Sequence, residues 1–427
     1  YQYELIYKRD FLDNEDHTFI FSATGNLFTK EQSSSFENKT VFGKSTFNNQ
    51  KTKTDFGQIN HTLKIDYVKP FSDKWKIETG AQFTDNDMSN DFEVQDQLDG
   101  LFVTNQGLTN VFDFRQKVLG LYGTGSFESD KWGIKLGLRR EQTNIKTNLL
   151  NSNLSNNKDF ADLFPTFHSS FKLIKKLSLQ AGYSRRIYRP SLWQLNPFIN
   201  IRNNFNIRKG NPNLKPEYSD SYELAAIYNI SGLSINCSFY RLNTTDKITY
   251  VTTLQNNISE TAPENLGTTN ANGIEINGKL NVGKKIVINS DFNLNRFNRR
   301  GLWGTQNFNF NGNRWSSELR SKIKFPKDLD LELTLNYLSD YRTVDGERGP
   351  SRNLNFGIRK KIVDGRGVIN LIVRDIFATR VRESRAIRSN FIVDNWSTSG
   401  TFFSLGFSYG FGKGEAMEYQ SKGGRRR

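Results

Sequence analysis

Residues suited to acid–base, nucleophilic or metal chemistry are few and scattered in this sequence. It contains three histidines, at His17, His61 and His168, and a single cysteine, Cys237. A structural metal site needs about four Cys or His ligands at close spacing, so this set predicts no metal centre. Carboxylates are spread along the chain without a pairing that would indicate general acid–base catalysis. We therefore expect a protein that is not an enzyme and that uses no cofactor.

The chemistry most available to this chain is the attraction of anions. Lys and Arg total 59 against 44 Asp and Glu, which gives a formal net charge of +15. These basic residues form no helical stripe, so nucleic acid is not expected as a partner. Lipopolysaccharide headgroups or an anionic solute would suit the charge, and a merely solvated polar surface is an open alternative. The candidate solute-binding or loop-base residues are Arg185, Arg186, Arg189, Arg202, Arg208 and Lys209, and Arg139 and Arg140 carry the same ambiguity.

The sequence predicts β-strands as the elements that hold these candidates, because apolar and polar residues alternate along it. In the segment 329–337, LDLELTLNY, leucines and a tyrosine fall on one face and polar residues on the other. About ten tilted residues suffice to cross the hydrocarbon layer of a membrane, and many of the alternating segments reach that length. The seventeen segments are 1–8, 17–28, 55–69, 74–87, 113–127, 132–143, 163–172, 176–188, 217–229, 233–247, 270–282, 285–298, 314–325, 329–341, 352–363, 366–377 and 401–411.

The connections between these segments alternate in length. Short turns such as 129–131, 230–232 and 282–284 are expected on one side of the sheet. Short turns on the periplasmic side and long loops on the extracellular side are typical of bacterial outer-membrane barrels. The long loops are expected at 88–112, 144–162, 189–216, 248–269, 299–313, 342–351 and 378–400.

Alternation, strand length and loop layout together predict an all-β fold, a transmembrane antiparallel β-barrel. In lipid every backbone N–H and C=O must be paired internally, so spanning strands have to close into a barrel. A soluble multi-domain β protein is the alternative, but its strands would be shorter and more evenly spaced. No stretch approaches the ~18 consecutive apolar residues that indicate a transmembrane helix. The aromatic residues expected at the membrane interfaces are Trp75, Trp132, Trp193, Trp315, Tyr409 and Phe411.

The barrel is expected to cover residues 1–413, with a disordered periplasmic tail at 414–427. If the last strand ends at the periplasm, alternating strand directions make segment 1–8 run toward the periplasm as well. An odd number of strands cannot close a bacterial barrel with both ends on that side. We therefore expect at least one further strand before Tyr1.

One segment, 183–224, has a more specific pattern. Arg189-Pro190-Ser191 is followed by LNPF at 195–198 and by GNPNLKPEYSDSYEL at 210–224. These pieces resemble TonB-dependent receptors, in particular the outer-membrane β-barrel family common in Bacteroidetes. The segment NLIVRDIFATR at 370–380 and the terminal strand at 402–413 resemble the same family, so the resemblance covers essentially the whole chain. The motif residues are Arg189, Pro190, Gly210, Asn211, Pro212, Leu214, Lys215, Pro216, Glu217, Tyr222 and Glu223.

The motif also has a local physical explanation. Pro212 and Pro216 fix φ and prevent a helix, so they hold the chain extended as it returns from a long loop into a strand. In that strand Glu223 is expected to face the lumen, opposite Tyr222. Two interpretations stay open: the motif shapes the return of the loop, or it contacts the solute directly.

The resemblance implies a bacterial outer-membrane location and a barrel of about 22 strands. It also implies an N-terminal plug domain with a TonB-binding motif, neither of which is visible in this sequence. The implied function is uptake of a solute such as a siderophore, glycan or peptide. The alternative is a non-transporting barrel subunit that scaffolds an outer-membrane protein complex. Expected partners are outer-membrane lipid and lipopolysaccharide, the TonB complex through the N-terminal part, and a surface lipoprotein or other complex subunits.

Overall fold

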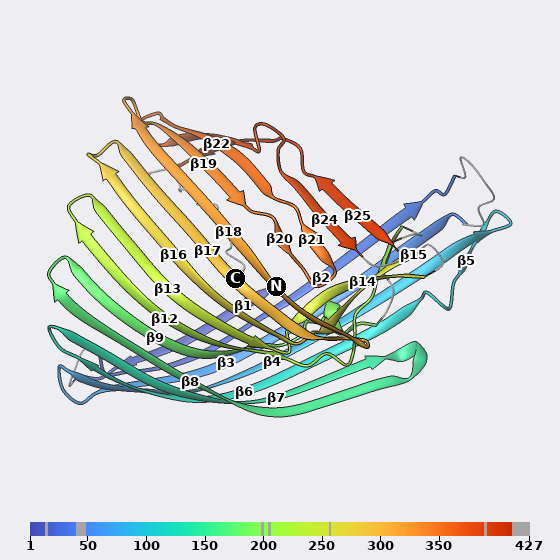
Figure 1. Ribbon diagram of the computed structural model, residues 1–427, viewed down its shortest axis with the longest axis horizontal. Coiled ribbons are helices and arrows are strands. Elements are labelled where there is room, and N and C mark those ends of the chain that lie inside the picture. Colours follow the sequence, from blue (N-terminus) through green and yellow to red (C-terminus); the bar gives the residue numbers. More distant parts are fainter. Residues whose placement is uncertain are drawn as a thin grey trace.

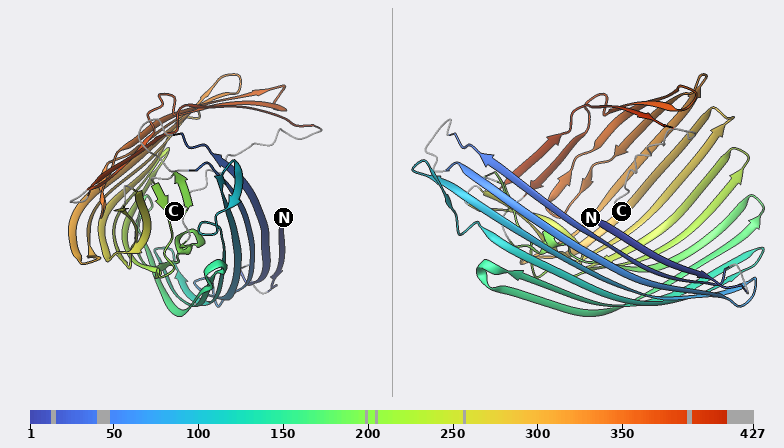
Figure 2. Two further views of the ribbon diagram at one scale, coloured as in Figure 1. Left: turned by 90° about the vertical axis from the view of Figure 1, so that its right-hand side faces the viewer. Right: turned by 180° about the vertical axis from the view of Figure 1, so that it is seen from behind.

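The wall of the molecule is one continuous antiparallel sheet that curves into a barrel (Figure 1 and Figure 2). The computed structural model describes residues 1–12, 16–39, 48–197, 200–203, 206–255, 258–387 and 391–411. Phe198 and the predicted tail at 414–427 lie outside these residues. The wall strands are β1 (Gln2–Asp10), β2 (Thr18–Phe36), β3 (Gln50–Pro70), β4 (Trp75–Leu98), β6 (Asn110–Glu128), β7 (Trp132–Leu149), β8 (Leu154–Ile174), β9 (Leu177–Tyr188), β12 (Glu217–Ile230), β13 (Leu233–Thr245), β16 (Thr268–Val282), β17 (Ile286–Trp303), β18 (Gln306–Phe325), β19 (Leu329–Leu338), β22 (Ser351–Ile362), β23 (Gly367–Arg374) and β26 (Phe402–Tyr409).

The predicted all-β antiparallel fold is confirmed, and each of the seventeen predicted segments is a wall strand. A short additional strand, β5 (Leu101–Thr104), extends the sheet beside β4. The sheet runs from β1, which pairs with β2, to β26, which pairs with β23. Among the described residues no pairing joins β1 to β26. The further strands and the plug implied by the resemblance stay predictions.

Several predicted loops are wrong, because the strands continue through them. Most of 144–162 is strand, since β7 ends at Leu149 and β8 begins at Leu154. In the same way β4 and β6 take up much of 88–112, and β17 and β18 take up nearly all of 299–313. In these upper segments most residues are polar, so the sequence lacks an apolar–polar alternation over a full strand length, while the backbone pairing continues.

The wall differs in height around the barrel. The strand β3 has 21 residues and β4 has 24, whereas β23 and β26 have 8 each. All of these strands reach the short-turn end of the barrel, where Gly367 pairs with Tyr409 and Pro70 with Lys76. The difference in length therefore lies at the opposite end, where the long loops are.

Alternate residues of each wall strand face opposite sides, as predicted. On β12, Leu224 is 63% exposed on the outer face, with Tyr222 beside it. Glu223 lies between them and lines a cavity on the lumen side, as predicted. An outer apolar row and an inner polar row are what a membrane-spanning barrel requires.

Aromatic pairs mark the two borders of the outer apolar band. At the short-turn end Trp75 contacts Phe127 with ring centroids 4.8 Å apart, and Trp132 similarly contacts Phe171. Toward the loop end, Trp315 stacks on Tyr337 at 4.3 Å, and Tyr183 lies 5.0 Å from Tyr222. The interfacial prediction is wrong for one residue. Trp193 lies in the short helix α1 (Leu192–Leu195), not at the end of a wall strand, because the chain turns inward there.

Two four-stranded sheets are built from the segments that connect wall strands at the loop end. We call residues 189–217 and 246–267 the inner fold; it contains α1 and lies within the curve of the wall (Figure 2). We call β20, β21, β24 and β25 the outer sheet. The inner fold pairs β10 (Asn200–Asn203), β11 (Asn206–Arg208), β15 (Ile258–Asn265) and β14 (Ile248–Gln255), and the outer sheet pairs β20 (Tyr341–Arg342), β21 (Gly346–Arg348), β24 (Val381–Ile387) and β25 (Ile392–Thr398).

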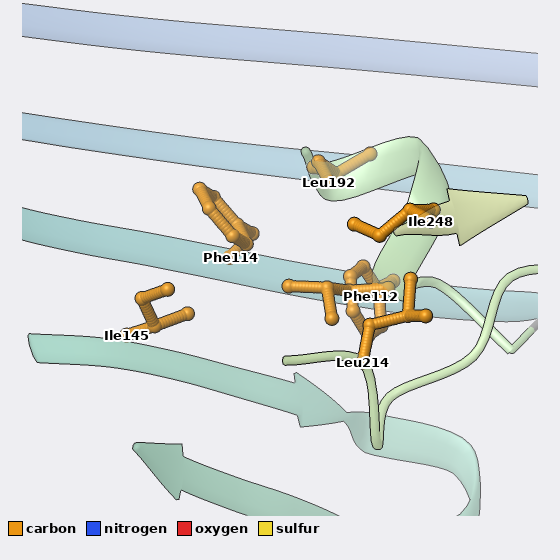
Figure 3. Packing of buried hydrophobic residues seen from close by; sticks show 7 residues of the cluster. Phe112, Phe114, Ile145, Leu192, Leu214 and Ile248 are labelled. Atoms are coloured by element: carbon orange, nitrogen blue, oxygen red, sulfur yellow. The ribbon is translucent and has the colours of Figure 1, made fainter. Parts of the chain in front are cut away.

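The main apolar core joins the inner fold to the wall. Wall side chains on β6 and β7 meet side chains of α1, of the motif and of β14 (Figure 3). Since burial of apolar surface drives this contact, the inner fold is packed against the wall rather than suspended in the lumen. Among the described residues, no helix has the length and apolarity needed to cross a membrane. The core residues are Phe112, Phe114, Ile145, Leu192, Leu195, Leu214 and Ile248.

Candidate functional site

The inner fold begins at Arg189, which is bound to the wall by a buried ion pair. Its Nη2 donates to Glu141 Oε2 at 2.5 Å, and the same guanidinium donates to Thr143 Oγ1 at 2.8 and 3.0 Å. The other carboxylate oxygen, Glu141 Oε1, accepts from Arg139 Nε at 2.5 Å. Glu141 is only 9% exposed, so both of its oxygens need such partners. Two guanidinium groups thus share one buried carboxylate.

This ion pair continues into a polar network across the lumen wall. The Arg139 guanidinium lies 5.2 Å from the centre of the Tyr122 ring. The Tyr122 hydroxyl donates to Asp66, which also forms an ion pair with Lys64 at 2.8 Å. The network therefore connects β3, β6 and β7 to the first residue of the inner fold.

Residues after Arg189 form one short, capped helical turn. The side chain of Gln194 accepts hydrogen bonds from the Ser191 backbone N–H and from the Tyr188 hydroxyl, both at 3.0 Å. Leu192 and Leu195 are fully buried against the wall. The exposed residue between them is Trp193, which stacks on Phe56 of β3.

The motif glycine is required by a close approach of two chain segments. Gly210 N–H donates to Asn196 O and Asn211 N–H donates to Gln194 O, each at 2.7 Å. A Cβ at Gly210 would lie 2.4 Å from Asn196 O and 2.6 Å from Gln194 O, closer than any side chain tolerates. Only glycine allows the returning chain to lie against α1.

The next motif residues are held through their backbone. Lys158 on β8 donates to Pro212 O at 2.7 Å and to Leu214 O at 2.6 Å. Asn265 on β15 accepts from the Lys215 backbone N–H at 2.7 Å and donates back to Lys215 O. The proline-rich return is thereby fixed between the wall and the inner sheet.

The motif ends at a second buried carboxylate. Glu217 is 7% exposed and accepts from Lys247 Nζ at 2.8 Å and from the Ile248 backbone N–H at 2.6 Å. It therefore joins the start of β12 to the start of β14. Together with Pro216, which is buried, it closes the inner fold at its second end.

The six basic candidates separate into different environments. Arg185 and Arg186 are neighbours on β9 and so face opposite sides. Arg186 lines the lumen cavity, whereas Arg185 shares the outer face with Tyr183 and lies over the Tyr218 ring. Strand alternation therefore puts Arg185 outside the lumen, and its place among the solute-binding or loop-base candidates stays a prediction.

The other basic candidates belong to the inner fold. Lys209 forms an ion pair with Glu260 at 2.6 Å, and the side chain of Arg208 is exposed. The side chain of Arg202 lies outside the described part of the chain, and only its backbone, in β10, is placed. A role for any of these residues in solute binding stays a prediction.

A second family-like segment, 370–380, is organised around one aspartate. Asp375 is almost fully buried, and its carboxylate accepts from the backbone N–H groups of Thr379 and Arg380 at 3.0 and 2.8 Å. Its own N–H donates to Asn355 Oδ1. Asp375 thus fixes the turn between β23 and the outer sheet.

Titratable groups in the two sheets are perturbed in opposite directions. On β15, burial raises the pKa of the Glu264 carboxyl. On β25, a hydrogen bond from Arg385 holds the pKa of Asp394 below its ordinary value. The first group is stabilised in its neutral form and the second as a carboxylate.

A cavity of about 550 Å³, open to the lumen, lies on the wall below the inner fold. Its lining is mostly small and polar, and it includes the Lys135–Glu78 ion pair at 3.0 Å. His168 also lies in this lining. In the described ranges, no group of three or more His, Cys, Asp or Glu side chains is placed to hold a metal ion. The charged and polar groups of the lining can form hydrogen bonds with a bound molecule.

The sequence did not identify the wall residues that hold the motif. Glu141, Thr143 and Lys158 are separated from their motif partners by about fifty residues. One signal was present: Arg139, Glu141 and Thr143 occupy alternate positions near the end of a predicted strand and so share a lumen face.

Comparison with known proteins supports both the fold and its location. Residues 10–409 match the model of the "Outer membrane protein beta-barrel family". No curated protein sequence matches the chain. The ferric citrate transporter FecA in its unliganded form aligns with a TM-score of 0.65 and 12% identity, over 95% of this chain and 60% of FecA. The copper transporter OprC gives the same TM-score and identity, over 95% of this chain and 64% of its own.

A third similar structure is the ferric yersiniabactin uptake receptor FyuA from Yersinia pestis. It aligns with a TM-score of 0.59 and 14% identity, over 91% of this chain and 58% of FyuA. At these identities the similarity concerns the fold alone. The chain spans about three fifths of the length of these proteins. The predicted likeness to receptor barrels is confirmed, while a Bacteroidetes origin stays a prediction.

Proposed function

Because the chain belongs to the outer membrane protein beta-barrel family, we propose that it forms the wall of a TonB-dependent receptor that takes up a solute. The location in the bacterial outer membrane follows from the family and from the fold. Three proteins of similar fold are named as an uptake receptor or as transporters, which supports this class of function.

The observation that carries the proposal is the inner fold. An open pore would leave the lumen clear, but here α1 and a four-stranded sheet fill part of it near the loop end. Two buried carboxylates, Glu141 and Glu217, hold this element in one position. A preorganised element inside the mouth is suited to recognising a solute before it passes.

In this proposal the energy for uptake comes from TonB, acting on a plug domain of the kind that the resemblance implies. The cavity lined by small residues and by the Lys135–Glu78 pair is the surface against which such a plug would rest. The wall residues bind and orient, and they perform no chemistry of their own.

Growth of a deletion strain tests the proposal. The strain is given a single limiting source at a time: ferric citrate, a ferric hydroxamate, copper, maltoheptaose or a tripeptide. We expect slow growth on one source, restored by the intact gene and abolished again by a protonophore that removes the energy supply of TonB. Normal growth of the deletion strain on every source would contradict uptake.

A second candidate function, scaffolding of an outer-membrane complex, is favoured by the outer sheet. Trp396 on its edge strand β25 is 75% exposed, and Ile392 on the same strand is also exposed. Exposed apolar residues on an edge strand indicate a protein contact. Loss of a co-purifying protein in Trp396→Ser, with normal growth on every source, would favour this role over uptake.

A further inference from the structure

Three aromatic rings from separate segments form a row on the lumen side of the mouth. Phe28 lies on β2, Phe56 on β3 and Trp193 on α1 of the inner fold. The Phe28 and Phe56 centroids are 6.1 Å apart, and Trp193 stacks on Phe56 at 5.6 Å with 28° between the ring planes. We call these three residues the aromatic row.

The aromatic row faces the lumen and not the lipid. The neighbours Leu27 and Ile59 belong to the outer face, so alternation puts Phe28 and Phe56 inside. Phe56 also packs against the buried core that joins the inner fold to the wall.

Two rings of the row are left open to a ligand. Trp193 is 55% exposed and Phe28 is 48% exposed. In the same helical turn, Leu192 and Leu195 are each only 1% exposed. The capped turn therefore buries its leucines and presents its tryptophan. An indole held by packing below and open above loses little entropy when a ligand binds it.

Polar side chains on the same face flank the rings. Lys30 pairs across the strands with Phe56, and Gln58 pairs with Phe28. Gln58 donates to Asn86 at 3.1 Å and Lys30 donates to Gln32 at 3.0 Å. Amide groups both donate and accept, and each keeps capacity for a further hydrogen bond.

This combination selects the chemistry of the ligand. Flat rings suit a ligand with an apolar ring face, and the C–H bonds of a sugar ring meet the negative face of an aromatic ring favourably. Amides suit hydroxyl groups. A multiply charged anion would require several cations. In the two cross-strand pairs, Phe28 with Gln58 and Lys30 with Phe56, Lys30 carries the one positive charge.

The geometry points to the aromatic row as a binding site for a neutral sugar ring of an oligosaccharide. This inference rests on the proposed uptake function and names the class of solute. Trp193 and Phe28 provide the stacking surfaces, Phe56 supports Trp193 from below, and Gln58 and Lys30 bind hydroxyl groups.

Calorimetric titration of the full-length protein in detergent tests this inference. The probes are maltoheptaose, cellohexaose and xylohexaose, with 2,3-dihydroxybenzoate as a planar ring that lacks a sugar face. We expect wild-type protein to bind at least one oligosaccharide, and Trp193→Ala to weaken that binding about tenfold, as expected for loss of one stacking contact. Trp193→Phe should restore most of the affinity.

The matched control is Trp396→Ala, which removes an even more exposed tryptophan from the outer sheet and should leave oligosaccharide affinity unchanged. Equal affinities of wild type and Trp193→Ala, or binding of dihydroxybenzoate without any oligosaccharide, would overturn the inference. Absence of binding to every probe would overturn it as well. A growth defect of the deletion strain on another source would then still uphold uptake, so the two failures are distinguishable.

Discussion

The inner fold and the outer sheet are built alike but are held differently. Both are four-stranded sheets formed from connections at the same end of the barrel. The inner fold is bound to the wall by the buried carboxylates Glu141 and Glu217, whereas the outer sheet has an exposed ion pair, Arg385 with Asp394 at 2.7 Å. Buried ion pairs break at high cost, while exposed pairs contribute little. We infer that the inner fold has one stable position and that the outer sheet adapts more freely.

Removing the carboxylate of Glu141 should have the largest effect on how firmly the inner fold is held, compared with the outer sheet. Glu141→Ala leaves two guanidinium groups without their acceptor and should cost the inner fold about 3–5 kcal/mol. Hydrogen exchange of residues 189–197, measured in detergent by mass spectrometry, should accelerate strongly, while residues 381–398 keep their rate. The control Arg140→Ala changes the adjacent, outward residue. Unchanged exchange in Glu141→Ala would show that the ion pair does not hold the inner fold.

Adding one carbon at Gly210 should have the next largest effect. The new Cβ of Gly210→Ala overlaps Asn196 O and Gln194 O, and such overpacking costs about 1–3 kcal/mol. Limited proteolysis should cut between residues 196 and 212 faster than in wild type. Gly125→Ala is the matched control, since no atom lies within 4 Å of its added Cβ. Equal cleavage in both variants would contradict the close approach.

Lys158→Met should loosen the inner fold less. It removes one ammonium group that donates to Pro212 O and Leu214 O. Hydrogen bonds of a charged group contribute about 1.5–3 kcal/mol, and we expect the lower end because this part-buried site lets water replace the donor. Hydrogen exchange should rise locally around residues 212–216 without reaching α1. Lys146→Met, at an exposed position of β7, should change nothing. An effect as large as that of Glu141→Ala would mean that the lysine, not the buried ion pair, is the main attachment.

Acidification should change the stability of the two sheets by a small amount and in opposite directions. The pKa of Glu264 is raised by burial, so the stability it contributes is present below about 4.5 and is lost as pH rises through its folded value. The pKa of Asp394 is lowered, so its contribution is present above about 3.8 and is lost as pH falls through its folded value. Pulsed hydrogen exchange between pH 7 and pH 3 should show more protection in β15 and less in β25.

Substitution separates these two contributions. Glu264→Gln should remove the gain in β15, and Asp394→Asn should remove the loss in β25. A shift of the same sign in both sheets would indicate a general effect of acid instead of these two carboxyl groups.

The wall was predictable from sequence because its signal is local. In 329–337 the apolar residues recur at every second position, and pairing places the whole segment in β19. The upper parts of the strands were not predictable in this way. Around Asn144 on β7 the inward face is buried, but it mixes Thr143 and Thr147 with Ile145, and the opposite face is polar too, so the sequence shows no apolar alternation there.

The site was predictable only in part. The prolines and glycine of the motif indicated a shaped return of the chain, and the contacts of Gly210 and the burial of Pro216 agree with that local interpretation. The partner of Arg189 was not predictable, because Glu141 lies 48 residues away and only the barrel brings them together. Trp193 looked like an interfacial residue, since an exposed tryptophan has the same sequence signature in a girdle and in an inner fold.

The unequal height of the wall has a consequence for how a solute arrives. β3 is 13 residues longer than β26, with 21 against 8, and at about 3.4 Å per residue and a 45° tilt its end stands roughly 30 Å higher. The mouth is therefore a sloping opening, and its plane is inclined to the membrane. Molecules that diffuse within the polysaccharide layer meet the long strands on one side of the mouth and the short strands on the other. The outer sheet is connected to the short strands, so we expect it to be the first surface that an approaching solute passes.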